Sequence, residues 1–211
     1  MKTTKKILFG TAMVLIFGLA ATLKAQDIYV ANQSSSTVGE YTTSGATVNA
    51  SLITGLGLNP IGIAISGSDL FVESWQKVGE FTTSGGTVNG SLFSGFDEPQ
   101  GLAISGNDLF VSNLGSGYIG EYTTTGTTIK YNLITDGGGP YGLAISGSDL
   151  FVVNWVQGTI GEYGLDGSVV NASLISGLNG PESIAISGND LFVTQNGNGT
   201  IGEYTTSGGG Q

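Results

Sequence analysis

The chain has 211 residues, 37 of them glycine, and it contains no cysteine, histidine or arginine. Six lysines oppose 16 acidic residues, which gives a formal net charge of −10. A chain this acidic lacks the cations with which proteins contact phosphates, so we expect no nucleic-acid binding and no attraction to anionic lipid surfaces. Without cysteine there are no disulfides, and burial and hydrogen bonds must hold any folded domain together.

Residues 1–25 differ from the rest of the chain and are typical of a secretory signal peptide. Lys2, Lys5 and Lys6 form a positive start, residues 7–23 are apolar, and Ala25 is a small residue at a suitable cleavage point. The mature chain would then begin at Gln26 and be secreted, periplasmic or held at the cell surface, with no membrane insertion after signal removal. An uncleaved N-terminal anchor is the alternative, because the apolar segment reaches the short end of what spans a bilayer. Both interpretations export residues 26–211.

The remaining chain is a tandem repeat with a period of about 41 residues. The sequence Asp-Leu-Phe-Val begins at Asp69, Asp108, Asp149 and Asp190, and a related segment, Asp-Ile-Tyr-Val, begins at Asp27. One such unit cannot bury its apolar faces alone, so repeats of this length with glycine-rich turns indicate units that stack around a common axis. The sequence therefore predicts an all-β protein, a β-propeller over residues 26–211.

Each complete repeat contains four predicted strands. In the unit that begins near Ile61, these are residues 62–66, 69–72, 78–83 and 87–93, separated by short turns rich in glycine and serine. The second strand is apolar at consecutive positions, as in Leu70, Phe71 and Val72. Both of its faces must therefore be covered, as in sheets that stack face to face.

The two terminal repeats are incomplete, which bears on the number of blades. Three units are complete, whereas residues 27–58 supply only the outer three strands and residues 183–210 only the inner three. We expect about five small four-stranded blades with incomplete terminal blades. The alternative is a fragment of a larger propeller that ends early at Gln211.

The repeat resembles a known group of propellers. Pro-x-Gly-(Ile/Leu)-Ala-Ile, followed by Asp-Leu-Phe-Val-x-Asn and Ile-Gly-Glu-Tyr-Thr, is similar to the NHL-type and Tyr-Val-Thr-Asn-type repeats of secreted bacterial proteins. The resemblance covers the whole mature chain and implies the propeller architecture. It does not imply one activity, because such propellers include enzymes, glycan-binding proteins and protein scaffolds.

Function is expected where the repeats differ from one another. In a propeller, the segments before the first strand and after the second strand of each blade emerge on one face. The only tryptophans, Trp75 and Trp155, follow the second strand, next to amide side chains, and suit stacking on sugar rings. Alternatively, they fill gaps between blades. The candidate ligand-binding residues are Trp75, Trp155, Gln100, Tyr141, Glu182, Asn113 and Asn154.

An enzyme is the alternative function. Related propellers with lactonase or lyase activity hold a divalent metal or use histidine, and the oxygen ligands available here would be Asp97, Glu98, Asp136 and Glu182. No pair of nucleophile and base is visible, so we predict no catalytic residue. The favoured interpretation is an exported, non-catalytic binding or scaffold module without a cofactor, whose partner is an unknown protein or a glycan.

Overall fold

The computed structural model describes residues 27–57, 59–135 and 137–210, and the predicted signal peptide lies outside these ranges. Within them the chain forms 18 β-strands and no helix, which confirms the all-β prediction. None of the described residues therefore forms a helix long and apolar enough to cross a membrane.

The strands form five antiparallel sheets, each built from consecutive segments of the chain. The first sheet contains β1 (Asp27–Asn32), β2 (Thr37–Thr42) and β3 (Thr47–Ile53). The second contains β4 (Pro60–Ser66), β5 (Asp69–Ser74), β6 (Lys77–Thr82) and β7 (Thr87–Ser94). The third contains β8 (Pro99–Ser105), β9 (Asp108–Asn113), β10 (Tyr118–Thr123) and β11 (Thr128–Thr135).

The fourth sheet contains β12 (Pro140–Ser146), β13 (Asp149–Asn154), β14 (Thr159–Gly164) and β15 (Val169–Ile175). The fifth contains β16 (Pro181–Ser187), β17 (Asp190–Gln195) and β18 (Thr200–Thr205). Among the described residues, the first and fifth sheets thus have three strands and the others four, as the incomplete terminal repeats predicted.

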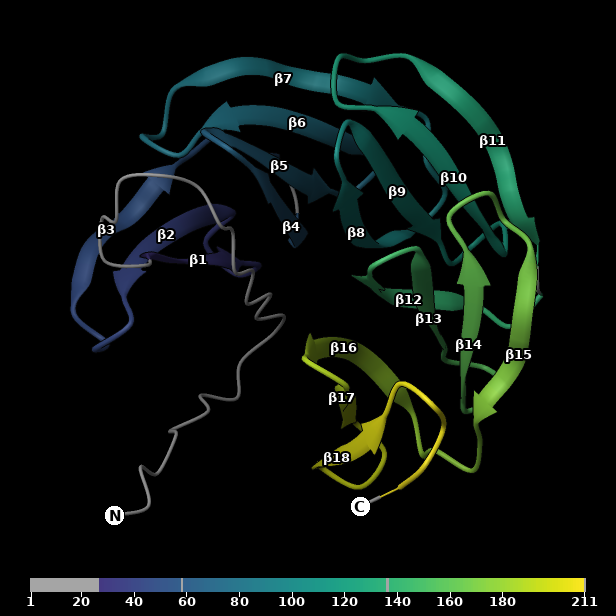
Figure 1. Ribbon diagram of the computed structural model, residues 1–211. Coiled ribbons are helices and arrows are strands. Elements are labelled where there is room, and N and C mark those ends of the chain that lie inside the picture. Colours follow the sequence, from purple (N-terminus) through teal and green to yellow (C-terminus); the bar gives the residue numbers. More distant parts are fainter. Residues whose placement is uncertain (1–26, 58, 136, 211) are drawn as a thin grey trace.

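The sheets are the blades of a β-propeller. They follow one another in chain order around a centre, with β4, β8, β12 and β16 innermost and β3, β7, β11 and β15 at the rim (Figure 1). Each innermost strand packs against the innermost strand of the next sheet. The first and fifth sheets lie at the two ends of this arrangement.

The core lies between the blades. In the third sheet, Leu109 and Val111 pack toward the second sheet, whereas Phe110 packs toward the fourth. The same alternation in β5 and β13 joins all five blades through four apolar clusters. The consecutive apolar residues of the second strands are therefore buried on both faces, which confirms the sequence prediction.

Glycine and proline set the geometry of the innermost strand. The hairpin to the second strand turns at Gly67, whose φ of 60° disfavours residues with a Cβ. Each of the four prolines is the first residue of an innermost strand, and a register irregularity follows it, as between Pro60 and Ile63. Proline fits there because a strand start requires no ladder donor.

Candidate functional site

Two sets of loops meet on one face of the propeller. Pro60 pairs with Ser74, and in the next blade Pro99 pairs with Asn113, so each second strand ends beside the start of its innermost strand. Backbone bonds extend this contact into the loops: the amide of Trp155 donates to the carbonyl of Gly139 at 3.0 Å. We call this side of the molecule the loop face. The segments expected to share one surface therefore do so.

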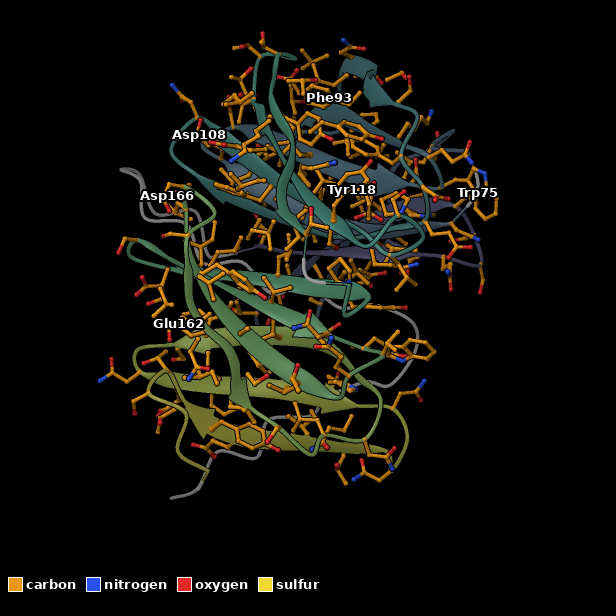
Figure 2. The ribbon with its side chains drawn as sticks, turned by 90° about the vertical axis from the view of Figure 1, so that its right-hand side faces the viewer. Trp75, Phe93, Asp108, Tyr118, Glu162 and Asp166 are labelled. Atoms are coloured by element: carbon orange, nitrogen blue, oxygen red, sulfur yellow. The ribbon has the colours of Figure 1, made fainter. Side chains whose placement is uncertain are left out.

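Both tryptophans are exposed on the loop face. Trp75 has 56% and Trp155 has 45% of its surface exposed, so neither ring is enclosed between blades. Figure 2 shows Trp75 at one end of the strands, with Asp108 and Asp166 at the opposite end. Exposed aromatic rings of this size lose little mobility on binding and provide flat apolar surface to a ligand.

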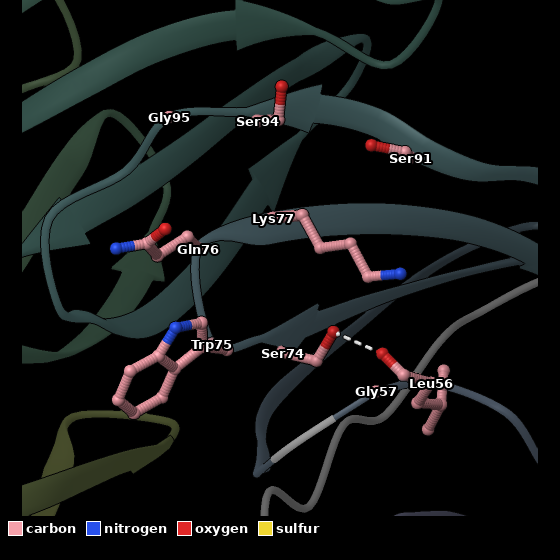
Figure 3. A pocket seen from close by; sticks show the side chains of 9 residues that line it. All are labelled: Leu56, Gly57, Ser74, Trp75, Gln76, Lys77, Ser91, Ser94 and Gly95. Carbon is pink, nitrogen blue, oxygen red and sulfur yellow. Dashed lines mark hydrogen bonds between the residues drawn. The ribbon is translucent and has the colours of Figure 1, made fainter.

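A surface pocket of about 300 Å³ lies beside Trp75. Its floor is formed by buried Leu56 and Ser74, and the Ser74 hydroxyl donates to the Leu56 carbonyl at 3.0 Å (Figure 3). The remaining lining residues come from the turn between β5 and β6 and from β7 and its end; they are Gly57, Trp75, Gln76, Lys77, Ser91, Ser94 and Gly95. The pocket could not be predicted from the sequence, because it forms only when β7 pairs beside β6 and the turn that carries Trp75.

Three other predicted residues occupy the second position of successive innermost strands. Gln100, Tyr141 and Glu182 are half-buried there, in β8, β12 and β16. Burial, together with the charges of Glu182 and Glu73, raises the pKa of Tyr141 to about 12. The amide of Asn196 donates to the Glu182 carboxylate at 2.8 Å. These residues are thus held near the centre of the propeller rather than beside Trp75.

Asn113 and Asn154 lie in the interior, unlike the other candidate ligand-binding residues. Both are fully buried, and the Asn154 amide donates to the Thr159 hydroxyl at 3.3 Å. The side-chain oxygen of each has no hydrogen-bond partner in the structure. A ligand on the loop face would not contact them directly. The Asn154 side chain ties the end of β13 to the start of β14, whereas the Asn113 amide donates to the Val111 carbonyl within β9.

Glu73 is a residue that the sequence interpretation missed. Its side chain is fully buried on the face of β5 that packs toward the third sheet, close to Gly62 and Leu102. Neither carboxylate oxygen has a hydrogen-bond partner, and burial raises the pKa of the carboxyl to about 8. A signal was present in the repeat, since the equivalent residues Ser112, Val153 and Thr194 are uncharged.

Three of the four residues of the metal-enzyme alternative, Asp97, Glu98 and Glu182, lie in the described part of the chain and form no metal-binding group there. Asp97 accepts a hydrogen bond from the Ser116 hydroxyl at 2.9 Å, and Glu182 is bound by Asn196. Asp136 lies outside the described residues. In the part of the chain that the structure describes, no group of three or more acidic side chains could hold a metal ion.

Comparisons with known proteins support the fold. No protein-family model and no curated protein matches this chain. A chain from a crystal structure of a nidogen/laminin complex is similar in structure, with 19% identity, a TM-score of 0.76, and coverage of 86% of this chain and 72% of that one. Selenomethionine-substituted virginiamycin B lyase from Staphylococcus aureus gives 18% identity, a TM-score of 0.68, and coverage of 90% of this chain and 66% of the lyase.

A catalytically inactive form of the same lyase, with quinupristin, gives 20% identity and a TM-score of 0.68. It is covered over 64% of its length, so this chain spans about two thirds of the lyase. At these identities the likeness concerns the fold. The molecule is a β-propeller. The neighbours include both a protein complex and a lyase, and the fold serves both kinds of function.

Proposed function

We propose that this propeller is an exported, non-catalytic binding module that takes a saccharide on its loop face. The observation that carries the proposal is the exposure of Trp75 and Trp155, the only two tryptophans of the chain. Large apolar rings left at the surface cost hydration free energy, and such surfaces mark binding sites when polar groups surround them. Gln76 and Gln157 are exposed beside the two rings.

Sugar rings have the chemical groups that can bind to an exposed tryptophan beside an amide side chain. One face of a pyranose ring carries C–H groups that stack on an aromatic ring, and its hydroxyl groups bond to amide and hydroxyl side chains. A stack of this kind contributes about 0.5–1.5 kcal/mol by analogy with aromatic pairs. Two such contacts supply about 1–3 kcal/mol, and hydrogen bonds from the neighbouring amide side chains must supply the rest. We therefore expect weak binding, with a dissociation constant between about millimolar and micromolar.

The test is a titration of the protein with a panel of soluble oligosaccharides, in which tryptophan fluorescence is monitored. We expect at least one saccharide to quench the fluorescence of the protein. Exchange of both tryptophans, Trp75→Ala with Trp155→Ala, should abolish binding measured by calorimetry while leaving the β-sheet circular dichroism spectrum intact. Val169→Ala is the matched control, because Val169 is also exposed, at 66%, but lies on the outer strand β15.

Two results would overturn the proposal. In the first, no saccharide in the panel is bound by the unmodified protein. In the second, binding survives the loss of both rings. Either result would leave a scaffold for a protein partner as the better interpretation of the exposed loop face.

A further inference from the structure

The turn that carries Trp75 differs from the equivalent turn of every other blade. Only residues 75 and 76 separate β5 from β6, whereas four residues stand between the second and third strands of each other sheet. Trp75 has a φ of 48°, in the left-handed region that a bulky residue rarely adopts because its side chain is strained there. A glycine or asparagine would satisfy such a turn at lower cost. Because the ring of Trp75 is also exposed, folding does not explain its presence there.

The first residue after this turn is Lys77. The other third strands begin with uncharged residues, which are Thr37, Tyr118, Thr159 and Thr200. Lys77 and Lys130 are the only lysines after residue 24, in a chain with 16 acidic residues. A cation is therefore placed at this one pocket and at no equivalent position of the repeat.

The two lysines have different surroundings. Lys130 lies opposite Glu121 on the neighbouring strand. Burial and the charge of Asp108 raise the pKa of the Glu121 carboxyl, and the charge of Lys130 partly offsets this rise. Hydrogen bonds from Ser168 lower the pKa of the Asp166 carboxyl, and Lys130 contributes in the same direction. Among the described residues, Lys77 has no ion pair with a carboxylate. The ammonium group of Lys77 is thus available to an anionic ligand, whereas the charge of Lys130 acts on carboxylates of the protein.

Trp75 and Lys77 line opposite parts of the pocket. In Figure 3 the indole ring of Trp75 lies at one end, and the Lys77 side chain extends from β6 toward the end formed by Ser91 and Leu56. A ligand that contacts both must be extended, with an apolar ring face at one end and a negative charge at the other. An oligosaccharide with charged sugar units has this form.

We propose that the pocket formed by Trp75, Gln76, Lys77, Ser91 and Ser94 binds an anionic oligosaccharide. Trp75 stacks on one sugar ring, and the Lys77 ammonium group pairs with the acid group of another. This inference rests on the proposed saccharide-binding function and narrows it to one pocket and one class of sugar. The site around Trp155 lacks the charge, because Thr159 takes the place of Lys77 there and bonds to Asn154.

The net negative charge of the protein opposes an anionic ligand at long range. At an ionic strength of 0.1 M the Debye length is about 10 Å, so most of this repulsion is screened while the contact with Lys77 persists. The test should therefore be made near that ionic strength. An exposed ion pair of this kind is expected to change affinity by about two- to fivefold.

The experiment compares ligands that have the same sugar backbone, with its acid groups either charged or esterified. The Trp155→Ala protein leaves Trp75 as the single fluorescent indole, and it is titrated with a galacturonate tetramer and with the methyl ester of the same tetramer. We expect the acid form to bind about two- to fivefold more tightly than the ester. Lys77→Gln should remove this preference, and Lys130→Gln, the matched control, should retain it. A sulfated tetramer distinguishes carboxylate from sulfate recognition.

The outcomes separate this inference from the proposed function. Equal affinity for acid and ester, or a preference that survives Lys77→Gln, would overturn the inference while saccharide binding stands. Failure of all three ligands and of the neutral panel would overturn both. Loss of the preference on Lys130→Gln would assign the effect to the overall charge of the protein rather than to the pocket.

Discussion

The buried carboxyl of Glu73 ties the stability of this protein to pH. In the folded protein, burial without a hydrogen-bond partner raises its pKa from 4.5 to about 8. The unfolded chain therefore releases this proton at lower pH than the folded chain does. Between about pH 4.5 and pH 8 the folded state binds more protons, so its free energy of unfolding falls as pH rises, and levels off above the folded pKa.

We predict that Glu73→Gln removes this part of the pH dependence. The variant should exceed the unmodified protein by about 2–4 kcal/mol in free energy of unfolding at pH 8, and by much less at pH 5. Denaturant unfolding of both proteins across this range measures the difference, and other titrating groups cancel in the comparison. Parallel profiles would contradict the assignment of the slope to Glu73.

The left-handed backbone at Trp75 gives a second prediction at this scale. Both Trp75→Ala and Trp75→Gly lose the indole ring, but only glycine accepts a φ of 48° without strain. The glycine variant should therefore be more stable than the alanine variant by about 1 kcal/mol. Chemical denaturation of the pair tests this expectation.

Trp155 provides the control for that comparison, because it has no positive φ. At this position the order should reverse, and Trp155→Gly should be less stable than Trp155→Ala. The same order at both sites would show that the backbone of the two turns does not differ as the structure describes.

At the scale of the element, the innermost strands are narrow because neighbouring blades converge on them. A Cβ on Gly101 of β8 would lie 2.5 Å from the carbonyl oxygen of Tyr141 in β12 and 3.2 Å from the amide nitrogen of Leu143. Ser112 uses the same close approach, since its hydroxyl donates to the Tyr141 carbonyl at 2.5 Å. The glycine therefore fixes how closely two blades approach.

We predict that Gly101→Ala lowers the free energy of unfolding by more than about 2 kcal/mol, because backbone atoms of the next blade must move. Gly90→Ala is the control: it lies in the outer strand β7, where the nearest atom to a new Cβ is 3.8 Å away. That change should be neutral or slightly stabilising. Thermal unfolding of the two variants makes the comparison, and equal effects would contradict the role given to the innermost strands.

At the scale of the whole molecule, equivalent residues of the repeat contribute differently to the free energy of unfolding in different blades. Phe110 and Phe192 occupy the same place in Asp-Leu-Phe-Val, yet Phe110 is fully buried against the fourth sheet and Phe192 is only half-buried. The difference arises because β13 covers one face of the third blade, whereas no described blade covers the equivalent face of the fifth.

We predict that Phe110→Ala costs about 3–5 kcal/mol in free energy of unfolding and that Phe192→Ala costs less than half as much. The removed atoms are the same, so only the covering blade differs between the two variants. Equilibrium denaturation measures both values. Similar losses would mean that the equivalent face of the fifth blade is covered in solution.

The repeat, the strand order and the shared surface of the two loop sets could be predicted from the sequence, because these features depend on local patterns. The residues next to Gly67 predict a turn there. The apolar neighbours of Phe71 likewise predict a strand that is covered on both faces. The burial of Asn113 and Asn154 could not be predicted from the sequence. An asparagine at the end of a strand gives the same sequence pattern whether its side chain is buried or faces solvent. The burial of Glu73 was not predicted either, because Gly62 and Leu102, which lie close to it, belong to other strands.

The sequence by itself determined that this protein is a stack of antiparallel blades, because period, turn glycines and apolar strands act within single repeats. Only the tertiary structure decided which side chains the stacked blades enclose and which they leave at the surface. Trp75 stands exposed at a two-residue turn beside Lys77, and β7 completes the pocket around them. That arrangement depends on contacts between residues of different strands, and the local sequence around each residue does not determine those contacts.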